Sequence, residues 1–280
     1  MTQEEIIRQS ILEDVGDGDH SSLACIDKSN QGSMQLLVKE DGIIAGIEVA
    51  KEVLAIIDSE IKMEQFLHDG DFVHKGDIAF ILTGSVQSML TAERTVLNFM
   101  QRMSGIATET HRYVQMVEGT NVTILDTRKT TPNMRYFEKY AVKVGGAENH
   151  RFGLFDMIML KDNHIDFAGG IEQAIDRTCN YLKEKNLNLK IEIETRSLED
   201  VRRVMAHGGV DRIMLDNFNV DDIREAVKII NGKYETEASG GITDQTLRQY
   251  AETGVDYISV GALTHHIKSL DLSLKFRKNI

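Results

Sequence analysis

The chain has 280 residues, more than one typical domain of about 100–200 residues and enough for a barrel with a smaller partner domain. Its composition, 27% charged and 41% hydrophobic, excludes intrinsic disorder. A net charge of −12 argues against nonspecific nucleic-acid binding, and only two cysteines, Cys25 and Cys179, exclude a disulfide framework.

Hydropathy and charge patterning narrow the class of protein further. No run of about 18 apolar residues occurs, and the first ten residues are polar and acidic, so we expect no membrane span, no secretory signal and a cytoplasmic location. Residues 1–80 contain 6 Lys/Arg and 17 Asp/Glu, whereas residues 128–161 contain 7 and 3. This basic stretch indicates either a small anionic ligand or a solvated basic face, and charge alone does not decide between them.

Residues 1–110 predict a first domain of short strands and helices. An Asp41-Gly42 turn predicts a β-hairpin that joins Met34–Val38 to Ile43–Ile47. A strand is expected over Ile78–Leu82, followed by a long helix from about Val86 to Glu118. Gly105 is expected to break or bend that helix, because an interior glycine costs about 1 kcal/mol relative to alanine.

The second half repeats a short apolar run, a polar or glycine end and a helix-like segment. The runs end at residues 126, 161, 194, 216, 239 and 261, a spacing of 22 to 35 residues that is typical of βα units. Six such units predict a (β/α) barrel over residues 111–267, with an open doubly wound sheet as the alternative. Ser197, Asn219 and Thr243 are expected to begin helices, and Gly208 to end one.

Chemistry-bearing residues gather where these strands end. In a barrel the active site lies at the carboxyl ends of the strands, so these residues are expected to share one mouth. They comprise a cationic set, a carboxylate set and two loops with glycine: Arg128, Lys129, His150, Arg151 and Lys161; Glu194 and Asp216; Ser239-Gly240-Gly241 and Gly261-Ala262.

Each set suits a different part of an anionic substrate. Glycine turns late in a barrel bind phosphate through backbone N–H groups, and arginine donates paired hydrogen bonds to carboxylates or phosphates. Two carboxylates beside a phosphate site suit magnesium or sugar hydroxyls. The set therefore predicts a phosphorylated sugar and a second anion as substrates. For any single residue, a helix cap or surface ion pair is the commoner role, and the sequence leaves Glu192 and Glu194 as alternatives for one position.

A second acidic group lies near the N-terminus. Asp14, Asp17, Asp19 and His20 are compatible with a metal cluster, but they lack the spacing of a calcium loop. We therefore interpret this segment as a polar turn.

Several motifs resemble those of the quinolinate phosphoribosyltransferases, also called carboxylating nicotinate-nucleotide pyrophosphorylases, which act in de novo NAD biosynthesis. The resemblance runs from about Glu13 to the C-terminus in the family's order. The motifs that carry it are TAERTVLNF at 91–99, DTRKTTP at 126–132, EKYAV at 138–142, NHR at 149–151, KDNH at 161–164, LDNF at 215–218, ASGGI at 238–242 and VGALTH at 260–265.

The resemblance implies a reaction and a role for each matched residue. The family transfers a phosphoribosyl group from phosphoribosyl pyrophosphate to quinolinate, with decarboxylation to nicotinate mononucleotide. Quinolinate would be held by Arg94, Arg128, His150, Arg151 and Lys161. Phosphoribosyl pyrophosphate would be held by Lys129, Glu194, Asp216, Ser239, Gly240, Gly241, Gly261 and Ala262, with Mg²⁺ on Glu194 and Asp216; the catalytic residues would be Lys129, Lys161, Glu194 and Asp216.

The resemblance also implies an architecture. The family has an N-terminal open α/β sandwich, here residues 1–110, and an incomplete barrel of about seven strands, here 111–267, with the C-terminal segment 268–280 packed back on the first domain. It forms at least a homodimer, in which Arg94 reaches the partner's site, and the choice between a dimer and a hexamer stays open. One departure is Ala147 in a loop where the family has a glycine triplet. Alanine disfavours positive φ, so this loop is expected to adapt while activity is retained.

Three other functions fit parts of the pattern. The first is a paralogue of molybdate-transport operons, which has the same fold and another acceptor; KDNH and the full arginine set favour quinolinate over it. The second is a barrel aldolase with Lys161 as the Schiff-base nucleophile, although a lysine among anion-binding residues suits a clamp better. The third is a noncatalytic phosphosugar sensor, which Glu194 and Asp216 disfavour.

Overall fold

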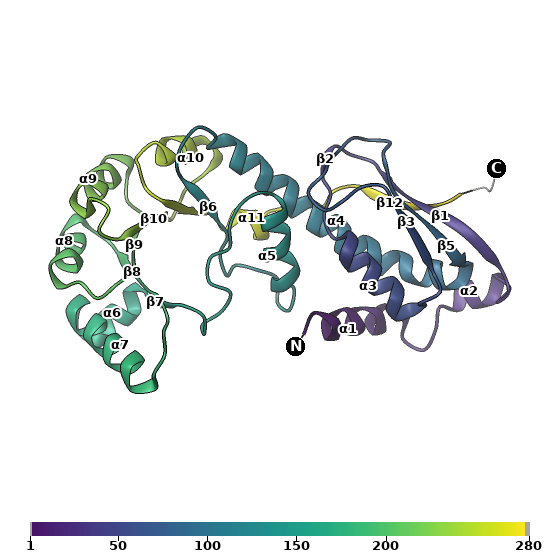
Figure 1. Cartoon of the computed structure of the whole chain (residues 1–280), viewed down its shortest axis with the longest axis horizontal. Coiled ribbons are helices and arrows are strands. Elements are labelled where there is room, and N and C mark those ends of the chain that lie inside the picture. The colour runs from purple at the N-terminus through teal and green to yellow at the C-terminus, as the bar shows by residue number, and fades with distance from the viewer. Residues whose placement is uncertain (1, 278–280) are drawn as a thin grey trace. The chain divides into compact units, whose positions relative to one another are not determined.

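The computed structural model describes residues 2–277, which form two compact units (Figure 1). The first contains the described residues up to His111, residues 130–146 and those from Ala262 onward. The second contains Arg112–Lys129 and Ala147–Gly261. Helix α5 (Arg135–Val144) therefore groups with the first unit, although its residues lie within the segment 111–267 that the sequence assigns to the barrel. A domain boundary at residue 110 stays a prediction.

An antiparallel sheet organises the first unit. Among residues 2–277 its strand order is β12 (Leu272–Phe276), β1 (Gln31–Val38), β5 (Ile78–Ser85) and β3 (Lys62–Gln65). The predicted hairpin is wrong, because β1 pairs with β5 and β12, whereas β2 (Gly42–Ile43) pairs with β4 (Phe72–Val73). The Asp41 carboxylate accepts from the backbone N–H of Lys75 at 2.7 Å, which ties this turn to a distant loop.

Helices accompany this sheet in the first unit. They are α1 (Gln3–Val15), α2 (His20–Cys25), α3 (Ile47–Ile57), α4 (Val86–Met116), α5 and α11 (Ala262–His265). Asp19 caps α2 by accepting from the backbone N–H of Ser22 at 3.1 Å, so the acidic turn before α2 serves as a helix start. Within residues 2–277 the metal-capable side-chain cluster lies elsewhere, which agrees with a polar turn here.

Helix α4 continues unbroken through Gly105, so the predicted break is wrong. A Cβ atom at this position would lie 2.3 Å from the carbonyl oxygen of Lys268. Glycine is therefore needed for the close approach of the C-terminal segment. Leu270 N–H donates to the Gln101 carbonyl at 2.9 Å and β12 then joins the sheet; of the predicted segment 268–280, residues 278–280 lie outside the described residues.

A curved parallel sheet organises the second unit. Within the described residues its strand order is β6 (Thr123–Leu125), β11 (Tyr257–Ser259), β10 (Glu235–Ser239), β9 (Arg212–Asp216), β8 (Ile191–Thr195) and β7 (Ile158–Leu160). All six predicted strands are confirmed. The first strand lies beside the last, as in a barrel, whereas a doubly wound sheet reverses its order midway, so that alternative is wrong.

The barrel is incomplete, as expected for the family that the sequence resembles. Glu148 forms an isolated parallel bridge to Leu125 on the free edge of β6. The six strands and this bridge account for the expected number of about seven among residues 2–277. No hydrogen-bonded pairing closes the gap between this edge and β7 in the part of the chain that the structure describes.

Helices cover the outer side of the curved sheet (Figure 1). They are α6 (Asp162–Ala168), α7 (Ile171–Lys185), α8 (Leu198–His207), α9 (Val220–Ile230) and α10 (Asp244–Ala251). Ser197, Asn219 and Thr243 are the N-caps of α8, α9 and α10, and Gly208 is the C-cap of α8, so the predicted helix ends are confirmed. None of the helices in residues 2–277 has the length and apolar character needed to cross a membrane.

Alternation along the strands separates an apolar face from a polar one. Ile193, Ile213, Leu215, Ala238 and Ile258 are fully buried and supply the face on which the helices pack. The neighbouring positions point the other way, into the barrel, and carry charge: Glu192 and Glu194 on β8, Arg212 and Asp216 on β9, and Glu235 and Glu237 on β10. The barrel interior is therefore lined by ionisable groups.

Candidate active site

Lys161, Glu194 and Asp216 meet at the carboxyl ends of three neighbouring strands. Lys161 Nζ lies 3.3 Å from Glu194 Oε2. Burial, and then the nearby carboxylate of Asp216, raise the pKa of Glu194, while the charge of Lys161 acts in the opposite direction. The structure thus brings two predicted carboxylates and one predicted cation together. It also fixes the turn that follows β7, because the backbone N–H of Lys161 donates to His164 Nδ1 at 3.0 Å.

The loop after β10 lies against the loop after β9. Ser239 is paired with Asp216 in the sheet register, and its carbonyl accepts from the backbone N–H of Asn217 at 2.8 Å. Gly240 and Gly241 have φ values of +89° and +64°, and a Cβ atom on Gly240 would lie 2.3 Å from Asn217 Oδ1. Only glycine allows this close left-handed turn, which leaves its backbone open toward a ligand. Gly261 and Ala262 follow β11, and α11 begins at Ala262.

Two arginines supply positive charge in the second unit. Arg128 follows β6, and Arg151 precedes β7 and donates from Nη1 to the Met157 carbonyl at 3.1 Å. Burial and the charge of Arg128 both lower the pKa of Arg151, as expected for two guanidinium groups held close together. The buried Nε of Arg128 has no hydrogen-bond partner within residues 2–277. A doubly charged anion would satisfy both groups.

The other predicted cations differ in their surroundings. Lys129 is exposed, one residue beyond Arg128, and its backbone N–H donates to Thr127 Oγ1 at 3.0 Å. Arg94 is exposed on α4 and belongs to the first unit.

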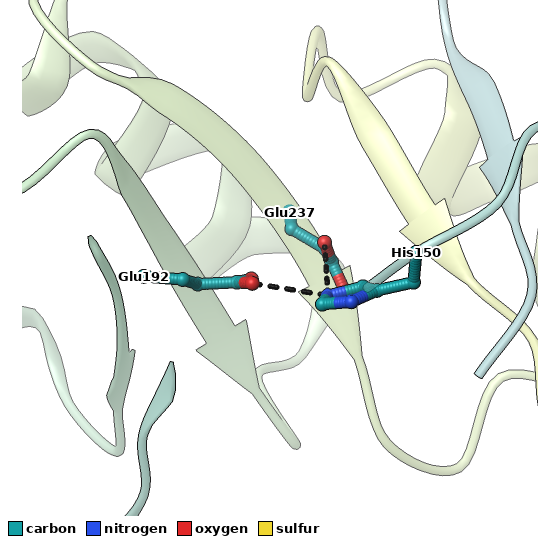
Figure 2. A group of neighbouring side chains, drawn as sticks. All are labelled: His150, Glu192 and Glu237. Atoms are coloured by element: carbon teal, nitrogen blue, oxygen red, sulfur yellow. Dashed lines mark ion pairs between the residues drawn. The ribbon is translucent and has the colours of Figure 1, made fainter. Parts of the chain in front are cut away.

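His150 lies in the interior of the barrel between two buried glutamates (Figure 2). Its Nε2 is 3.0 Å from Glu192 Oε2 and 3.4 Å from Glu237 Oε2. Burial alone would lower the pKa of His150, yet both carboxylates raise it, and burial raises the pKa of Glu192. Glu192 and Glu194 thus share a strand face but contact different partners, which resolves the ambiguity left by the sequence.

Sequence reasoning did not assign three residues around His150. Asp126 is fully buried and accepts from the backbone N–H of His150 at 2.8 Å. Glu237 accepts from Arg212 Nη1 at 2.9 Å. Its pKa is lowered despite burial, chiefly by His150 and then by Ser259 and the charge of Arg212. Two glutamates in the five-residue run ETEAS were the available signal, because charge inside a buried strand requires a partner.

Two carboxylate groups are candidates for holding a metal. Glu194 and Asp216 offer only oxygen atoms at the barrel mouth, which is the donor set that Mg²⁺ prefers. Among the described residues, His150, Glu192 and Glu237 also bring ligand atoms within 4.8 Å of one another. Arg212 already holds Glu237 there, so a cation at that interior position would meet an arginine beside it.

Profiles of two domains match this chain. The profile of the quinolinate phosphoribosyl transferase C-terminal domain matches residues 106–275, and that of the N-terminal domain matches residues 19–104. The chain belongs to the quinolinate phosphoribosyltransferase family. It is 45% identical over 285 residues to the decarboxylating quinolinate phosphoribosyltransferase 1b of Nicotiana tabacum, which covers 96% of this chain and 81% of that protein.

Bacterial proteins are similarly close to this chain. The probable carboxylating nicotinate-nucleotide pyrophosphorylase of Bacillus subtilis is 42% identical over 270 residues, 96% of this chain and 92% of the relative. The crystal structure of NadC from Streptococcus pyogenes superposes with a TM-score of 0.93 at 40% identity and covers 98% and 97% of the two chains. The resemblance seen in the sequence motifs is confirmed, and so is the fold class.

The structure also accommodates the departure at Ala147. Gly146 adopts a positive φ of +95°, whereas Ala147 does not and is buried. The loop therefore needs glycine at 146 and tolerates alanine at 147, so the positive φ that alanine disfavours does not arise there.

Proposed function

We propose that this chain transfers the phosphoribosyl group of phosphoribosyl pyrophosphate to quinolinate, with release of pyrophosphate and carbon dioxide, to give nicotinate mononucleotide for NAD biosynthesis. The observation that carries this proposal is the composition of the second unit. It combines a close arginine pair, two adjacent carboxylates and a left-handed glycine loop. Family membership and the names of the close relatives support the same reaction.

The glycine loops and the carboxylates would bind the phosphoribosyl half. Ser239, Gly240 and Gly241, with Gly261 and Ala262, are suited to the 5′-phosphate, because glycines and small residues let a phosphate come close to backbone N–H groups. Glu194 and Asp216 would accept hydrogen bonds from the ribose hydroxyls. Their negative charge would stabilise the positive charge that develops on the ribose as pyrophosphate leaves. Lys129 would lie along the departing pyrophosphate.

Mg²⁺ fits the same carboxylates. Two oxygen donors, one with a raised pKa beside a second carboxylate, favour a bound divalent cation. When bound, Mg²⁺ would neutralise charge on the pyrophosphate leaving group. The task of Glu194 and Asp216 would be to hold it, directly or through water.

The cations would bind the quinolinate half. Arg128, Arg151 and Lys161 would clamp the two carboxylates, with His150 beside them, and aim the ring nitrogen at the anomeric carbon. Orientation of this kind supplies up to about 7–11 kcal/mol of barrier reduction. Once the ring nitrogen is alkylated, its positive charge stabilises the carbanion left by the departing adjacent carboxylate. No covalent enzyme intermediate is required.

The test is a product assay on the purified protein with quinolinate, phosphoribosyl pyrophosphate and Mg²⁺. We expect nicotinate mononucleotide and carbon dioxide in equal amounts, and neither product when nicotinate replaces quinolinate. Pyrophosphate release without either product would instead indicate a phosphoribosyltransferase with a different acceptor, as in the molybdate-operon paralogue.

We also propose a homodimer in which Arg94 of each protomer completes the site of the other, with a hexamer as the larger assembly. The exposure of Arg94 on α4 is compatible with this role. The test mixes two inactive variants, Arg94→Ala and Glu194→Gln, after reversible dissociation. In a mixed dimer one site regains both native residues, so activity should return to roughly a quarter of wild type for random pairing. No recovery would place Arg94 in its own protomer's site or outside any site.

Cytoplasmic location remains a prediction for this chain. The relatives differ in this respect, because the Arabidopsis thaliana protein is named chloroplastic and one Nicotiana tabacum protein mitochondrial. Fractionation of the source cells would decide the location.

A further inference from the structure

Glu192 and Glu237 are buried carboxylates that the proposed reaction does not use. Both are fully buried on the inner faces of β8 and β10. Within residues 2–277 no hydrogen bond reaches either oxygen of Glu192, so the imidazole of His150 is its principal close partner. Burying a carboxylate costs several kcal/mol before compensation, and replacing a whole buried ion-pair group by apolar residues of similar volume is often neutral or stabilising. Stability alone therefore does not explain why the interior contains this group.

The imidazole of His150 is held at both of its nitrogen atoms. Nε2 faces Glu192 and Glu237, at 3.0 and 3.4 Å (Figure 2). Nδ1 accepts from the backbone N–H of Arg151 at 2.7 Å. A nitrogen that accepts a hydrogen bond carries no proton, so the ring proton lies on Nε2. With its nitrogens engaged in this way, His150 is oriented toward the protein rather than toward the barrel mouth.

The same contacts fix the segment that carries Arg151. The backbone N–H of His150 and the Nδ2 group of Asn149 both donate to the carboxylate of Asp126, at 2.8 and 2.7 Å. The guanidinium of Arg151 then reaches the Met157 carbonyl at 3.1 Å and lies near Arg128. The orientation of the imidazole therefore fixes the backbone N–H of Arg151, the arginine that would bind quinolinate.

We propose that Glu192 and Glu237 are positioning residues, which orient His150 and through it hold Arg151 for the carboxylates of quinolinate. This inference rests on the proposed function. It adds a role for His150, which positions Arg151 through the contact of its Nδ1 with the backbone N–H of that residue. It also explains why two buried carboxylates are kept where apolar residues would pack.

The experiment compares Glu192→Gln and Glu192→Leu in the full-length protein. The probe is benzene-1,2-dicarboxylate, which has the paired carboxylates of quinolinate and no reacting nitrogen. For Glu192→Leu we expect affinity for the probe to fall, and the KM of quinolinate to rise, by roughly 10- to 100-fold, because small misplacements of a clamp have effects of this size. The KM of phosphoribosyl pyrophosphate should stay within twofold. Glu192→Gln keeps a polar oxygen beside Nε2 in a side chain of nearly the same shape, and it should recover most of the lost affinity.

Glu235→Gln is the matched control. Glu235 lies on β10 and binds Arg212 as Glu237 does, whereas the ion pairs of His150 are made with Glu192 and Glu237. Its substitution should leave both KM values unchanged.

Four results would overturn the inference. Unchanged affinity in Glu192→Leu would remove the positioning role. A parallel loss of melting temperature and of affinity for both substrates would make the role merely structural. Equal losses in Glu192→Gln and Glu192→Leu would show that negative charge, not orientation, is required. A stoichiometric metal in the purified protein that is lost in Glu192→Gln would assign the cluster to metal binding. If the wild type binds no benzene-1,2-dicarboxylate and makes no product, the proposed function itself fails.

Discussion

The mouth and the interior of the barrel both concentrate charge, but they do so under different conditions. At the mouth, the side chains of Lys161 and Glu194 are 47% and 9% exposed, whereas in the interior the side chains of Glu192 and Glu237 are 0% exposed. Exposed charges can exchange water for a ligand, while buried charges must be compensated permanently by one another. The same residue types therefore contact ligands at the mouth of the barrel and hold other side chains in place in its interior.

The largest effect on kcat is expected from substitution of the carboxylates at the mouth, Glu194 and Asp216. Glu194→Gln should lower kcat by roughly 100-fold or more, because it removes charge that stabilises the developing ribose cation. Steady-state kinetics at saturating Mg²⁺ measure this, with Glu199→Gln, an exposed carboxylate in the first turn of α8, as the control. A kcat near that of the control variant would separate the mouth carboxylates from the chemistry.

The next effect concerns the cation opposite them. Lys161→Ala should raise the KM of quinolinate by roughly 10- to 100-fold, because a hydrogen bond to a charged group is worth about 1.5–3 kcal/mol. The charge of Lys161 lowers the pKa of Glu194, so its removal should also move the acidic limb of the pH–rate profile to higher pH. Lys190→Ala is the control, because Lys190 lies before the first residue of β8, at the end of the strand opposite Glu194. Wild-type turnover in Lys161→Ala would remove Lys161 from the site.

A smaller effect on substrate binding is expected from the uncharged glycine loop of the mouth, Gly240 and Gly241. Gly240→Ala should raise the Kd of phosphoribosyl pyrophosphate by roughly tenfold, because a left-handed residue with a side chain costs about 1–3 kcal/mol. Gly241→Ala should have a weaker effect, since its added Cβ meets open space while that of Gly240 meets Asn217. Calorimetric titration of each variant with phosphoribosyl pyrophosphate measures both, and an equal loss would mean that strain alone, without the contact to Asn217, decides the affinity.

The smallest expected effect is a change in how activity at acidic pH depends on Mg²⁺, because protons and metal compete for Glu194. The raised pKa of Glu194 means that this carboxyl takes up a proton at higher pH than an ordinary glutamate. Activity should therefore fall early on the acidic side, and a tenfold increase in Mg²⁺ should recover it about two- to fivefold there, because metal and proton compete for the same oxygens. At pH 8 the same increase should have no effect. An acidic limb that ignores Mg²⁺ would argue against Glu194 as a metal ligand.

The sequence predicted the barrel well and the first unit less well, for a physical reason. The strand ends at Asp126, Lys161, Glu194, Asp216 and Ser239 follow from local patterns, because each βα unit is contiguous in the chain. The partners of β1 are β5 and β12, and β12 lies more than 200 residues away, where local pattern carries no information. The hairpin error arose there. Gly105 was misinterpreted for the same reason, since its close neighbour Lys268 is distant in sequence.

In the candidate site, too, local sequence patterns identified some residues, whereas others depend on three-dimensional contacts. Ligand-facing residues at strand ends were found because they interrupt apolar runs and match family motifs. The supporting residues Glu237, Arg212 and Asp126 were not assigned, because their function depends on which strand faces meet inside the barrel. Strand parity alone placed Glu192 and Glu194 on one face, but their separate partners required the three-dimensional register.

The central claim is that the arginines and Lys161 clamp a pyridine dicarboxylate so that one of its two carboxylates is lost. The most direct measurement uses quinolinate labelled with carbon-13 in either carboxyl group, with phosphoribosyl pyrophosphate and Mg²⁺. We predict that label from the carboxyl group next to the ring nitrogen appears as carbon dioxide in amounts equal to pyrophosphate, while label from the other stays in nicotinate mononucleotide. Release of pyrophosphate with both labels still in unreacted quinolinate would contradict the assignment of the acceptor.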